Sequence, residues 1–398
     1  MNSEELVKLE NLIKLETGKL DSNYANEKGI YPFFTCAPTP LKIDTYSYDK
    51  KAILLAGNNA NGNFHINYYE GKFDAYQRTY IIEVKNEEIL NIKFLYYYLK
   101  ICLNNFKHFS QGTSTKFLTK KIINNFKIRL PPLDFQLKCI NILKIIDKEI
   151  TTIKKINKNL ENQILALFKK CFFNFDFKDT PLEGMNIRMK SSEGGNIPET
   201  WEIKYLDDKQ DCPIIKSGID KFDHEKIYIA TADVNNSTII NNNTLITMNN
   251  KPSSANMQPI KKSIWFAKMI DSRKLIMVDD KYSSILNNYI FSTGFCGLNC
   301  SNELFYYLWT FLLTDRFNNM KDILCNGTTM QAINNTNVKN ISYIKPDNEI
   351  LNYFNKIAKP IYDKIHLNKL ENTYLTKLRD NLLPKLMSGE LDVSQVEL

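Results

Sequence analysis

The sequence predicts a mixed fold of the α/β (α+β) class, in which a domain and the long helix that follows it occur twice. Three observations support this class: an internal repeat, short β-type runs inside each copy, and a coiled-coil pattern after each copy. We expect two mixed α/β domains in a pseudo-twofold arrangement, separated by two long antiparallel coiled-coil helices. With 398 residues, 43% of them hydrophobic, the chain can bury more than one core.

The repeat is clearest in a loop, a short strand and a helix start. Residues 110–136 read SQGTSTKFLTKKIINNFKIRLPPLDFQ, and residues 326–351 read NGTTMQAINNTNVKNISYIKPDNEIL. Gly112 aligns with Gly327, 215 residues later, and the alignment needs no gap. A period of about half the chain excludes a solenoid and indicates a duplicated domain.

Short β-type runs precede each loop. AILLA and TYIIEV occur in the first copy, and SIWFA and LIMVD in the second, each broken by Asn and Gly. Between the copies, a stretch rich in Gly, Pro, Ser and charge predicts a linker. The predicted boundaries are a first domain at 1–131, a first long helix at 132–175, a linker at 176–200, a second domain at 201–346, and a second long helix with a C-terminal tail at 347–398.

The first long helix has an apolar seam with a spacing of 3.5 residues. Successive a and d positions of the heptad are Leu143, Ile146, Ile150, Ile153, Asn157, Leu160, Ile164 and Leu167. Seven of these eight are aliphatic, which is typical of a coiled coil. A single Asn at an a position fixes register and partner at some cost in stability.

The second long helix repeats the pattern less regularly. Its seam contains Ile357, Ile361, Leu375, Leu378 and Leu382, and Lys364 and Glu371 interrupt it. Pro360 is expected to kink this helix or to mark its start. The alternative is that both helices are ordinary amphipathic helices, each lying on its own domain, but the narrow seam and the length favour a coiled coil.

The charge distribution favours a polyanionic partner. The chain carries a net charge of +8, and residues 89–133 contain eight basic residues and no carboxylate. Between Asp233 and Asp271 the only charged side chains are four lysines. Such surfaces suit nucleic acid, although an AT-rich genome would also enrich Lys and Asn. Scattered cysteines, no secretory signal and no membrane-spanning run predict a cytoplasmic protein without a membrane partner.

No catalytic or metal-binding motif is complete. The four histidines lie far apart in the sequence, so we expect no metal site. LAGNNANGN lacks the GK[ST] of a P-loop, and LPPL lacks the polar residue of the Pro-Pro motif in DNA adenine methyltransferases. KPDNEIL lacks the lysine of a PD…ExK nuclease. We therefore expect a non-catalytic chain with no cofactor of its own.

Several segments together resemble the DNA-specificity subunit of type I restriction-modification systems. They are LPPLDFQLKCINILKIIDKEI, GNIPETWEIKYL, KSGIDKFDHEKIYIATADV and the ending LRDNLLPKLMSGELDV. The resemblance covers nearly the whole chain and implies two target-recognition domains that alternate with two conserved helical regions. It also implies that each domain reads one half of an asymmetric, bipartite DNA site, while the helices set the gap.

The resemblance further implies the partners. These are double-stranded DNA and two DNA adenine methyltransferase subunits, which would carry S-adenosylmethionine; a restriction or translocase subunit can join them in that family. Two alternatives stay open: a coiled-coil interaction scaffold that binds no DNA, and a nuclease or methyltransferase with unrecognised motifs.

Candidate DNA-binding residues lie on the two Gly-Thr loops and nearby polar segments. In the first domain they are Asn58, Asn59, Arg78, Gln111, Gly112, Thr113, Ser114, Lys116, Lys120 and Lys121. In the second they are Lys216, Lys268, Arg273, Lys274, Thr328, Thr329 and Gln331. Lys and Arg suit phosphate contacts, whereas Asn, Gln, Arg and Thr suit base edges. Tyr96–Tyr98 and Phe305–Tyr307 are expected in helix cores instead of stacking on bases.

Overall fold

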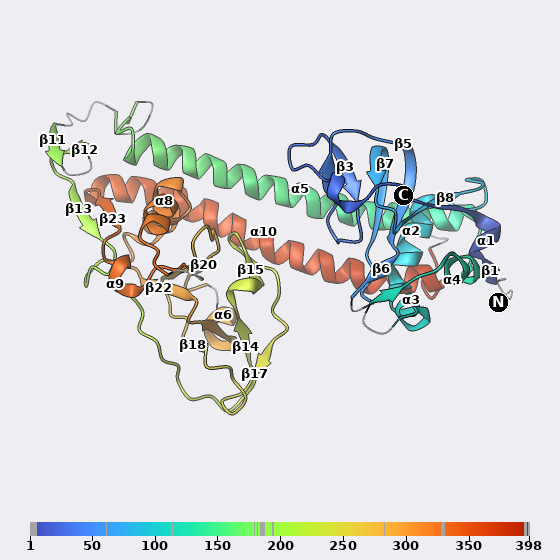
Figure 1. Ribbon diagram of the computed structural model, residues 1–398. Coiled ribbons are helices and arrows are strands. Elements are labelled where there is room, and N and C mark those ends of the chain that lie inside the picture. The colour runs from blue at the N-terminus through green and yellow to red at the C-terminus, as the bar shows by residue number, and fades with distance from the viewer. Residues whose placement is uncertain are drawn as a thin grey trace. The chain divides into compact units, whose positions relative to one another are not determined.

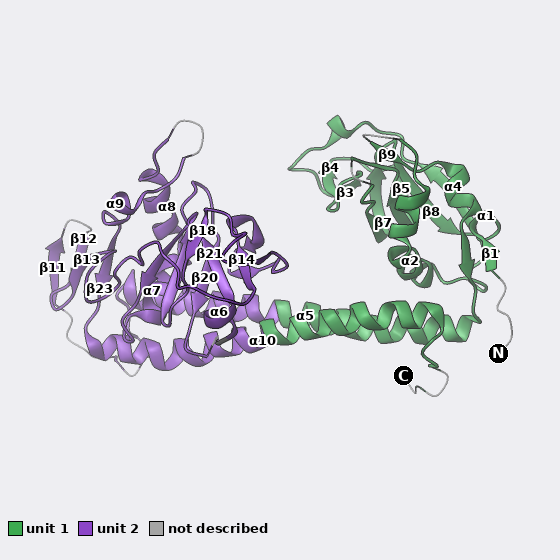
Figure 2. Ribbon diagram, turned by 90° about the horizontal axis from the view of Figure 1, so that it is seen from below, with its two compact units in different colours: residues 1–154, 369–398 green, residues 155–368 purple. Residues whose placement is uncertain are grey.

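The chain forms two compact units (Figure 2). The computed structural model describes all residues except 1–5, 61, 113–114, 179, 181, 184–187, 193–194, 282, 328–330, 394–395 and 397–398. Unit 1 comprises residues 1–154 and 369–398, and unit 2 comprises residues 155–368. Each unit therefore contains an α/β region and one half of each long helix. The mixed α/β class predicted from the sequence is confirmed.

Unit 1 is built on a six-stranded sheet in the order β2-β8-β5-β7-β3-β4. Four of its strands, β3, β5, β7 and β8, are labelled in Figure 1. The strands are β2 (Ile13–Thr17), β3 (Tyr31–Phe34), β4 (Leu41–Ile43), β5 (Tyr48–Ala56), β7 (Ile66–Ala75) and β8 (Thr79–Val84). The predicted run AILLA is the buried end of β5, a central strand. Because side chains alternate along a strand, Ile53 and Leu55 pack in one core with Leu95 and Leu99 of α2 (Ile92–Ile101), whereas Leu54 packs in a second core.

Shorter elements complete the α/β region of unit 1. They are β1 (Leu6–Lys8), α1 (Leu9–Leu12), the 3₁₀ turn η1 (Ser22–Tyr24), β6 (Asn58–Asn59), α3 (Leu103–Phe109), β9 (Lys116–Phe117), α4 (Lys120–Asn125) and β10 (Lys127–Arg129). β1 pairs with β10, and β6 pairs with β9.

Unit 2 has a three-stranded sheet, β20-β19-β22, and a four-stranded sheet, β17-β14-β21-β18. The strands are β14 (Lys226–Ile229), β17 (Leu245–Ile246), β18 (Ala255–Met257), β19 (Ser263–Ala267), β20 (Leu275–Val278), β21 (Tyr289–Ser292) and β22 (Phe295–Asn299). Its helices are α6 (Ser283–Asn288), α7 (Phe305–Leu312), α8 (Asp315–Ile323) and α9 (Asn335–Val338). Every residue of α7 is buried, so Phe305–Tyr307 are core residues.

Further short elements of unit 2 are β11 (Met189–Ser192), β12 (Gly195–Pro198), β13 (Glu202–Tyr205), the 3₁₀ turn η2 (Thr231–Asp233), β15 (Val234–Asn235), β16 (Thr238–Ile239) and β23 (Ser342–Lys345). β13 pairs with β23, as β1 pairs with β10 in unit 1. The stretch predicted as a linker contains the antiparallel pair β11–β12.

The internal repeat recurs element by element. The starts of α4, β10 and the long helix α5 (Leu133–Phe172) are followed 215 residues later by the starts of α9, β23 and the long helix α10 (Asn348–Ser388). The helix-capping residues Thr119 and Asn334 have the same separation. The two copies therefore share one backbone plan from the loop to the long helix.

The two long helices pack antiparallel within each unit. In unit 1 the Cys139 thiol lies against the Leu386 carbonyl, and the Arg379 guanidinium pairs with Asp147 at 2.9 Å. In unit 2 the Asn368 amide donates to the Asn157 side-chain oxygen at 2.7 Å. As the residue number increases along α5, the number of the contacting residue on α10 decreases, so the two helices run antiparallel.

The seam residues proposed on α5 lie on its packed face. Leu143, Ile146, Ile150, Ile153, Asn157 and Ile164 are buried, and Leu160 and Leu167 are half-buried. Among the α10 positions proposed, Ile357, Ile361, Leu375, Leu378 and Leu382 are half-buried. Between 354 and 368 the buried side chains of α10 are Phe354, Ala358, Tyr362, Ile365 and Asn368. The inward face is thus rotated by about one residue from the predicted seam, which explains why Lys364 can stay exposed.

Pro360 does not mark the start of α10, because the helix begins twelve residues earlier at Asn348. A proline lacks the N–H that would bond to the carbonyl four residues before it. Pro360 is exposed, so water can reach that part of the helix.

Candidate nucleic-acid interface

A short hairpin carries the Gly-Thr loop of unit 1. The amide and carbonyl of Gln111 bond to those of Phe117 at 3.0 and 2.9 Å, which closes the loop. Gly112 has φ +98°, and a Cβ added there would overlap with the Thr115 carbonyl oxygen. Only glycine fits this conformation without strain. Gln111 is exposed, whereas the candidate residues Thr113 and Ser114 lie outside the described residues.

Unit 2 repeats this hairpin at the same spacing. Asn326 and Ala332 exchange two main-chain hydrogen bonds at 3.1 and 3.0 Å, and Gly327 has φ +118°. Gln331 is exposed. The candidate residues Thr328 and Thr329 lie outside the described residues. The two loops thus have the same closing bonds and the same left-handed glycine.

Each hairpin docks on the end of a central strand. In unit 1 the Leu118 amide donates to the Gly57 carbonyl at 2.8 Å, and Asn58 pairs with Phe117. In unit 2 the Ile333 amide donates to the Lys268 carbonyl at 2.9 Å, and Met269 pairs with Ala332. Gly57 directly follows β5 and Lys268 directly follows β19, so the two docking points are structurally equivalent.

A second hydrogen bond joins each docking point to the next strand of the sheet. The Gly57 amide donates to the Arg78 carbonyl at 2.8 Å, and the Lys268 amide donates to the Gly294 carbonyl at 2.9 Å. Arg78 directly precedes β8, and Gly294 directly precedes β22. At these equivalent backbone positions, unit 1 has Gly57 opposite Arg78, and unit 2 has Lys268 opposite Gly294. We call each of these two hydrogen-bonded pairs the docking rung of its unit.

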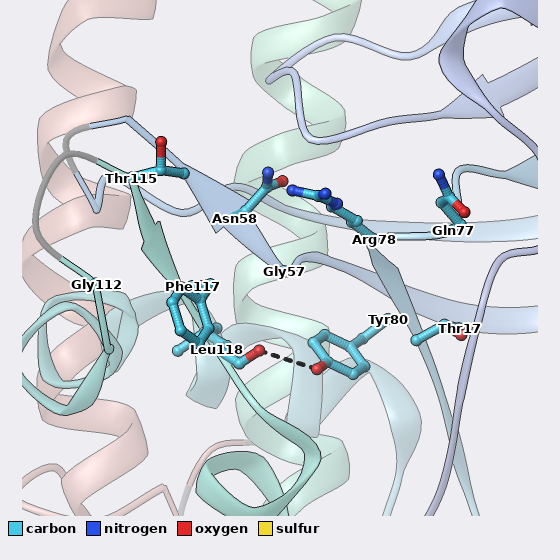
Figure 3. A pocket seen from close by; sticks show the side chains of 10 residues that line it. All are labelled: Thr17, Gly57, Asn58, Gln77, Arg78, Tyr80, Gly112, Thr115, Phe117 and Leu118. Atoms are coloured by element: carbon cyan, nitrogen blue, oxygen red, sulfur yellow. Dashed lines mark hydrogen bonds between the residues drawn. The ribbon is translucent and has the colours of Figure 1, made fainter.

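A cavity of about 530 Å³ lies at the docking rung of unit 1 (Figure 3). Thr17, Asn58, Gln77, Arg78, Thr115 and Phe117 are among the residues that line it. No carboxylate belongs to its described lining, and the Tyr80 hydroxyl donates to the Leu118 carbonyl at 3.0 Å at its base. The cavity brings together Asn58, Arg78 and Gly112, which sequence analysis had selected from three separate segments.

Several candidate side chains of unit 1 are available to a ligand. Asn58 and Arg78 point toward one another above the cavity (Figure 3). Neither side chain has a hydrogen-bond or ion-pair partner among the described residues. The same holds for the ammonium groups of Lys116, Lys120 and Lys121, of which the last two are exposed. Asn59 differs, because its side-chain oxygen accepts from the Asn63 amide at 3.2 Å.

Two candidate cations of unit 2 are engaged inside the protein. The Arg273 guanidinium pairs with Asp322 at 2.8 Å, and the Lys274 ammonium donates to the Thr231 carbonyl at 2.7 Å. Lys216 is exposed, but no recorded contact among described residues joins it to the hairpin. Lys268 alone of these four lies at the docking rung. We therefore leave Arg273 and Lys274 out of the proposed interface.

The sequence reading missed Gln77, Thr115 and Thr17 as cavity residues. Thr115 could have been found, because it belongs to the same Gly-Thr loop, and Gln77 precedes Arg78. The Gln77 amide donates to Asp21 at 3.2 Å, so it is less free than Arg78. Thr17 carries no local signal, because only the pairing of β2 with β8 places it there.

The perturbed thiols do not suit nucleophilic chemistry. Burial raises the pKa of Cys102, Cys139 and Cys171 to about 11, and that of Cys212 and Cys296 to about 12. These thiols are protonated at neutral pH, whereas the thiolate is the reactive form. Across the described part of the chain, no group of three His, Cys, Asp or Glu residues is placed to hold a metal ion. Within the same residues, no helix combines the length and apolar character needed to cross a bilayer.

Comparison with known proteins finds similarity to the specificity subunits of type I restriction enzymes. Residues 2–162 match the type I restriction modification DNA specificity domain. The EcoDI specificity subunit of Escherichia coli is 37% identical over 233 residues, which are 54% of this chain and 50% of that protein. The MjaIX specificity subunit of Methanocaldococcus jannaschii is 28% identical over 322 residues, 76% of this chain and 70% of that protein.

A solved structure has the same fold. The S subunit of a type I restriction-modification system from M. genitalium superposes over 97% of both chains, with a TM-score of 0.57 and 15% identity. The alignment with the EcoDI subunit spans half of that protein's length. Residues 2–162 thus resemble a type I restriction modification DNA specificity domain, and the similar proteins are type I specificity subunits, in agreement with the resemblance of the sequence segments.

Proposed function

We propose that this chain is a non-catalytic subunit that binds DNA in a sequence-specific way, each unit reading one half of a bipartite, asymmetric site. The observation that carries the proposal is the pair of hairpins. They share main-chain bonds and a left-handed glycine but present different side chains at the docking rung. One backbone element used twice with different chemistry is what two unlike half-sites require.

The proposed partners are double-stranded DNA, two DNA adenine methyltransferase subunits that carry S-adenosylmethionine, and a restriction or translocase subunit. The similarity to type I specificity subunits supports these partners, and the exposed lysines of the first hairpin region support DNA. The proposed location is the prokaryotic cytoplasm, where such partners act.

The test is a salt-dependent gel-shift assay with the chain in complex with its methyltransferase subunits, together with methylome sequencing. We expect a single bipartite methylation motif that disappears when the gene for this chain is deleted. A protein-interaction scaffold that does not bind DNA would leave the methylome unchanged. Methyl transfer or cleavage by the isolated chain would refute the non-catalytic role.

The long helices are proposed to set the gap between the half-sites, since α5 and α10 each run from one unit into the other. Removing one heptad from each helix shortens the pair by about 10 Å, at ~1.5 Å per residue. We expect the non-specific gap in the motif to shrink by about three base pairs while the half-sites keep their sequences. A gap of unchanged length would refute this role.

A further inference from the structure

We infer that Arg78 reads a guanine in the DNA half-site bound by unit 1, with Asn58 beside it as a second base-reading side chain. The inference rests on the proposed function and adds the residue and the base. Arg78 sits at the docking rung, where β5, β8 and the Gly-Thr hairpin meet. Its guanidinium is exposed and has no partner among the described residues.

The chemistry of the cavity fits a base edge better than a phosphate. Phosphate oxygens only accept hydrogen bonds, so a phosphate site needs donors alone. The Arg78 guanidinium can serve either target, but the rim also holds the Asn58 carboxamide and the Thr115 hydroxyl, whose oxygens can accept hydrogen bonds from the amino groups of base edges. Arginine pairs with both O6 and N7 of guanine in the major groove, and this is the commonest base-specific contact.

The backbone at the docking rung holds Arg78 in place. Its carbonyl accepts from the Gly57 amide at 2.8 Å and from the Cys36 thiol at 3.6 Å. A Cβ on residue 57 would overlap with that same carbonyl oxygen, so glycine lets the two strands approach closely. The side chain is therefore free while its main chain is fixed, which is the arrangement a specific contact needs.

Unit 2 has different chemistry at the equivalent positions. Gly294 replaces Arg78, Lys268 replaces Gly57, and Met269 replaces Asn58. Met269 is 46% exposed, and an apolar side chain in the groove favours the methyl group of thymine over a base edge that carries an amino group. The basic side chain thus lies just before β8 in unit 1 but just after β19 in unit 2, and unit 2 has no carboxamide in place of Asn58. The two docking rungs therefore cannot read the same bases.

The experiment is methylome sequencing of the full complex in a host without other adenine methyltransferases. With Arg78→Ala we expect one guanine position in a single half-site to lose discrimination by about 10-fold or more, while the other half-site is unchanged. With Arg78→Gln we expect that position to shift toward adenine, because glutamine pairs with N6 and N7 of adenine. Both variants should keep the wild-type circular dichroism spectrum and melting temperature, since the side chain has no recorded structural role.

The matched control is Lys120→Ala, which removes an exposed cation from the same unit. It should lower methylation at every sequence alike, as a lost phosphate contact does. An unchanged motif in Arg78→Ala, or a uniform loss like that of Lys120→Ala, would overturn the inference and leave the proposed function intact. A wild-type complex that methylates no bipartite motif would overturn both.

Discussion

In unit 1 the strand that ends at Ala56 is followed by Gly57, which is hydrogen-bonded to Arg78. In unit 2 the strand that ends at Ala267 is followed by Lys268, which is hydrogen-bonded to Gly294. The main-chain bonds at the two places correspond one to one. This difference teaches that the backbone of the repeat is the constant part and that the side chains at the rung are the variable part. The two glycines differ in their surroundings: a Cβ on residue 57 would overlap with the Arg78 carbonyl oxygen, whereas a Cβ on residue 294 would meet the Thr231 side chain at 3.0 Å.

The polar contacts of the helix pair also differ between the units. In unit 1 the Tyr97 hydroxyl of α2 donates to Asp147 of α5 at 2.7 Å, and the Arg379 guanidinium of α10 pairs with the same carboxylate at 2.9 Å. A hydrogen bond thus joins the helix pair to α2, and an ion pair joins the two long helices. In unit 2 the corresponding contact is aromatic: the rings of Tyr306 and Tyr362 are stacked, with their centroids 6.1 Å apart. The Asn157–Asn368 pair is a buried polar contact between the two helices there, and the Tyr362 hydroxyl of α10 lies 2.8 Å from the Thr310 hydroxyl of α7.

The largest expected effect comes from changing the loop glycine of unit 1. Gly112→Ala places a Cβ against the Thr115 carbonyl in a left-handed conformation and should destabilise the hairpin by about 1–3 kcal/mol. Hydrogen exchange of residues 111–118 should speed up, and the unit 1 half-site should lose specificity. Gly195→Ala is the control, because Gly195 also has a positive φ but open space around it. Equal effects on local exchange in the two variants would contradict a role for the steric overlap.

Next in size is the buried asparagine pair. Asn368→Ala leaves the Asn157 side-chain oxygen without its 2.7 Å donor and should cost about 1–3 kcal/mol of unfolding free energy. The exposed Asn159→Ala on α5, the helix that carries Asn157, should cost less than about 0.5 kcal/mol. Denaturant titration followed by circular dichroism measures both.

The double variant Asn157→Leu with Asn368→Leu sharpens the same comparison. Replacing both partners by apolar groups should restore stability but weaken the choice of helix register. Heterogeneous spacer lengths in the methylome would reveal the lost register. A single spacer length in this variant would show that contacts between the long helices and the α/β regions, such as that of Tyr97 with Asp147, are enough to fix the helix register.

A smaller effect is expected from the exposed lysines of unit 1. Lys120→Ala with Lys121→Ala should weaken binding to all duplexes and flatten the slope of log affinity against log salt by about 1–2. Lys144→Ala with Lys148→Ala, on the exposed side of α5, is the matched control. If the slope stays the same in the first variant, these lysines do not contact phosphates.

The smallest effect is an acid sensitivity of unit 2. Burial opposes the charged form of Asp279, but hydrogen bonds from Lys262 and Tyr306 hold the pKa of its carboxyl below the ordinary value. Burial likewise opposes the charge of Asp322, and Arg273 and Lys321 lower its pKa. This stabilisation is complete above the unfolded pKa of about 3.9 and is lost as the pH falls through the lower folded values.

Tryptophan fluorescence can follow this titration, because Trp201, Trp265 and Trp309 all lie in unit 2. We expect the stability reported by fluorescence to fall as the pH drops below about 4. Asp279→Asn should lower stability at neutral pH and reduce that fall. A variant with the same acid dependence as the wild type would show that Asp279 is not among the groups responsible.

Much of the local structure could be predicted from the sequence. The repeat, the strands AILLA, TYIIEV and SIWFA, and the start of α5 agree with the structure, because short-range patterns of apolar residues, glycine and proline determine them. The site was predicted in part. Asn58, Arg78 and Gly112 meet at one cavity, but nothing local showed that Arg273 and Lys274 would be bonded inside unit 2.

The sequence by itself determined the duplication, the two long helices and the glycine that each loop requires, since each depends on neighbouring residues. Only the tertiary structure decided which strands meet the hairpins, which cations remain free, and which face of α10 turns inward. The physical reason is that strand pairing and helix packing join segments far apart in the chain. A side chain's environment there depends on its partners and leaves no mark on its own surrounding sequence.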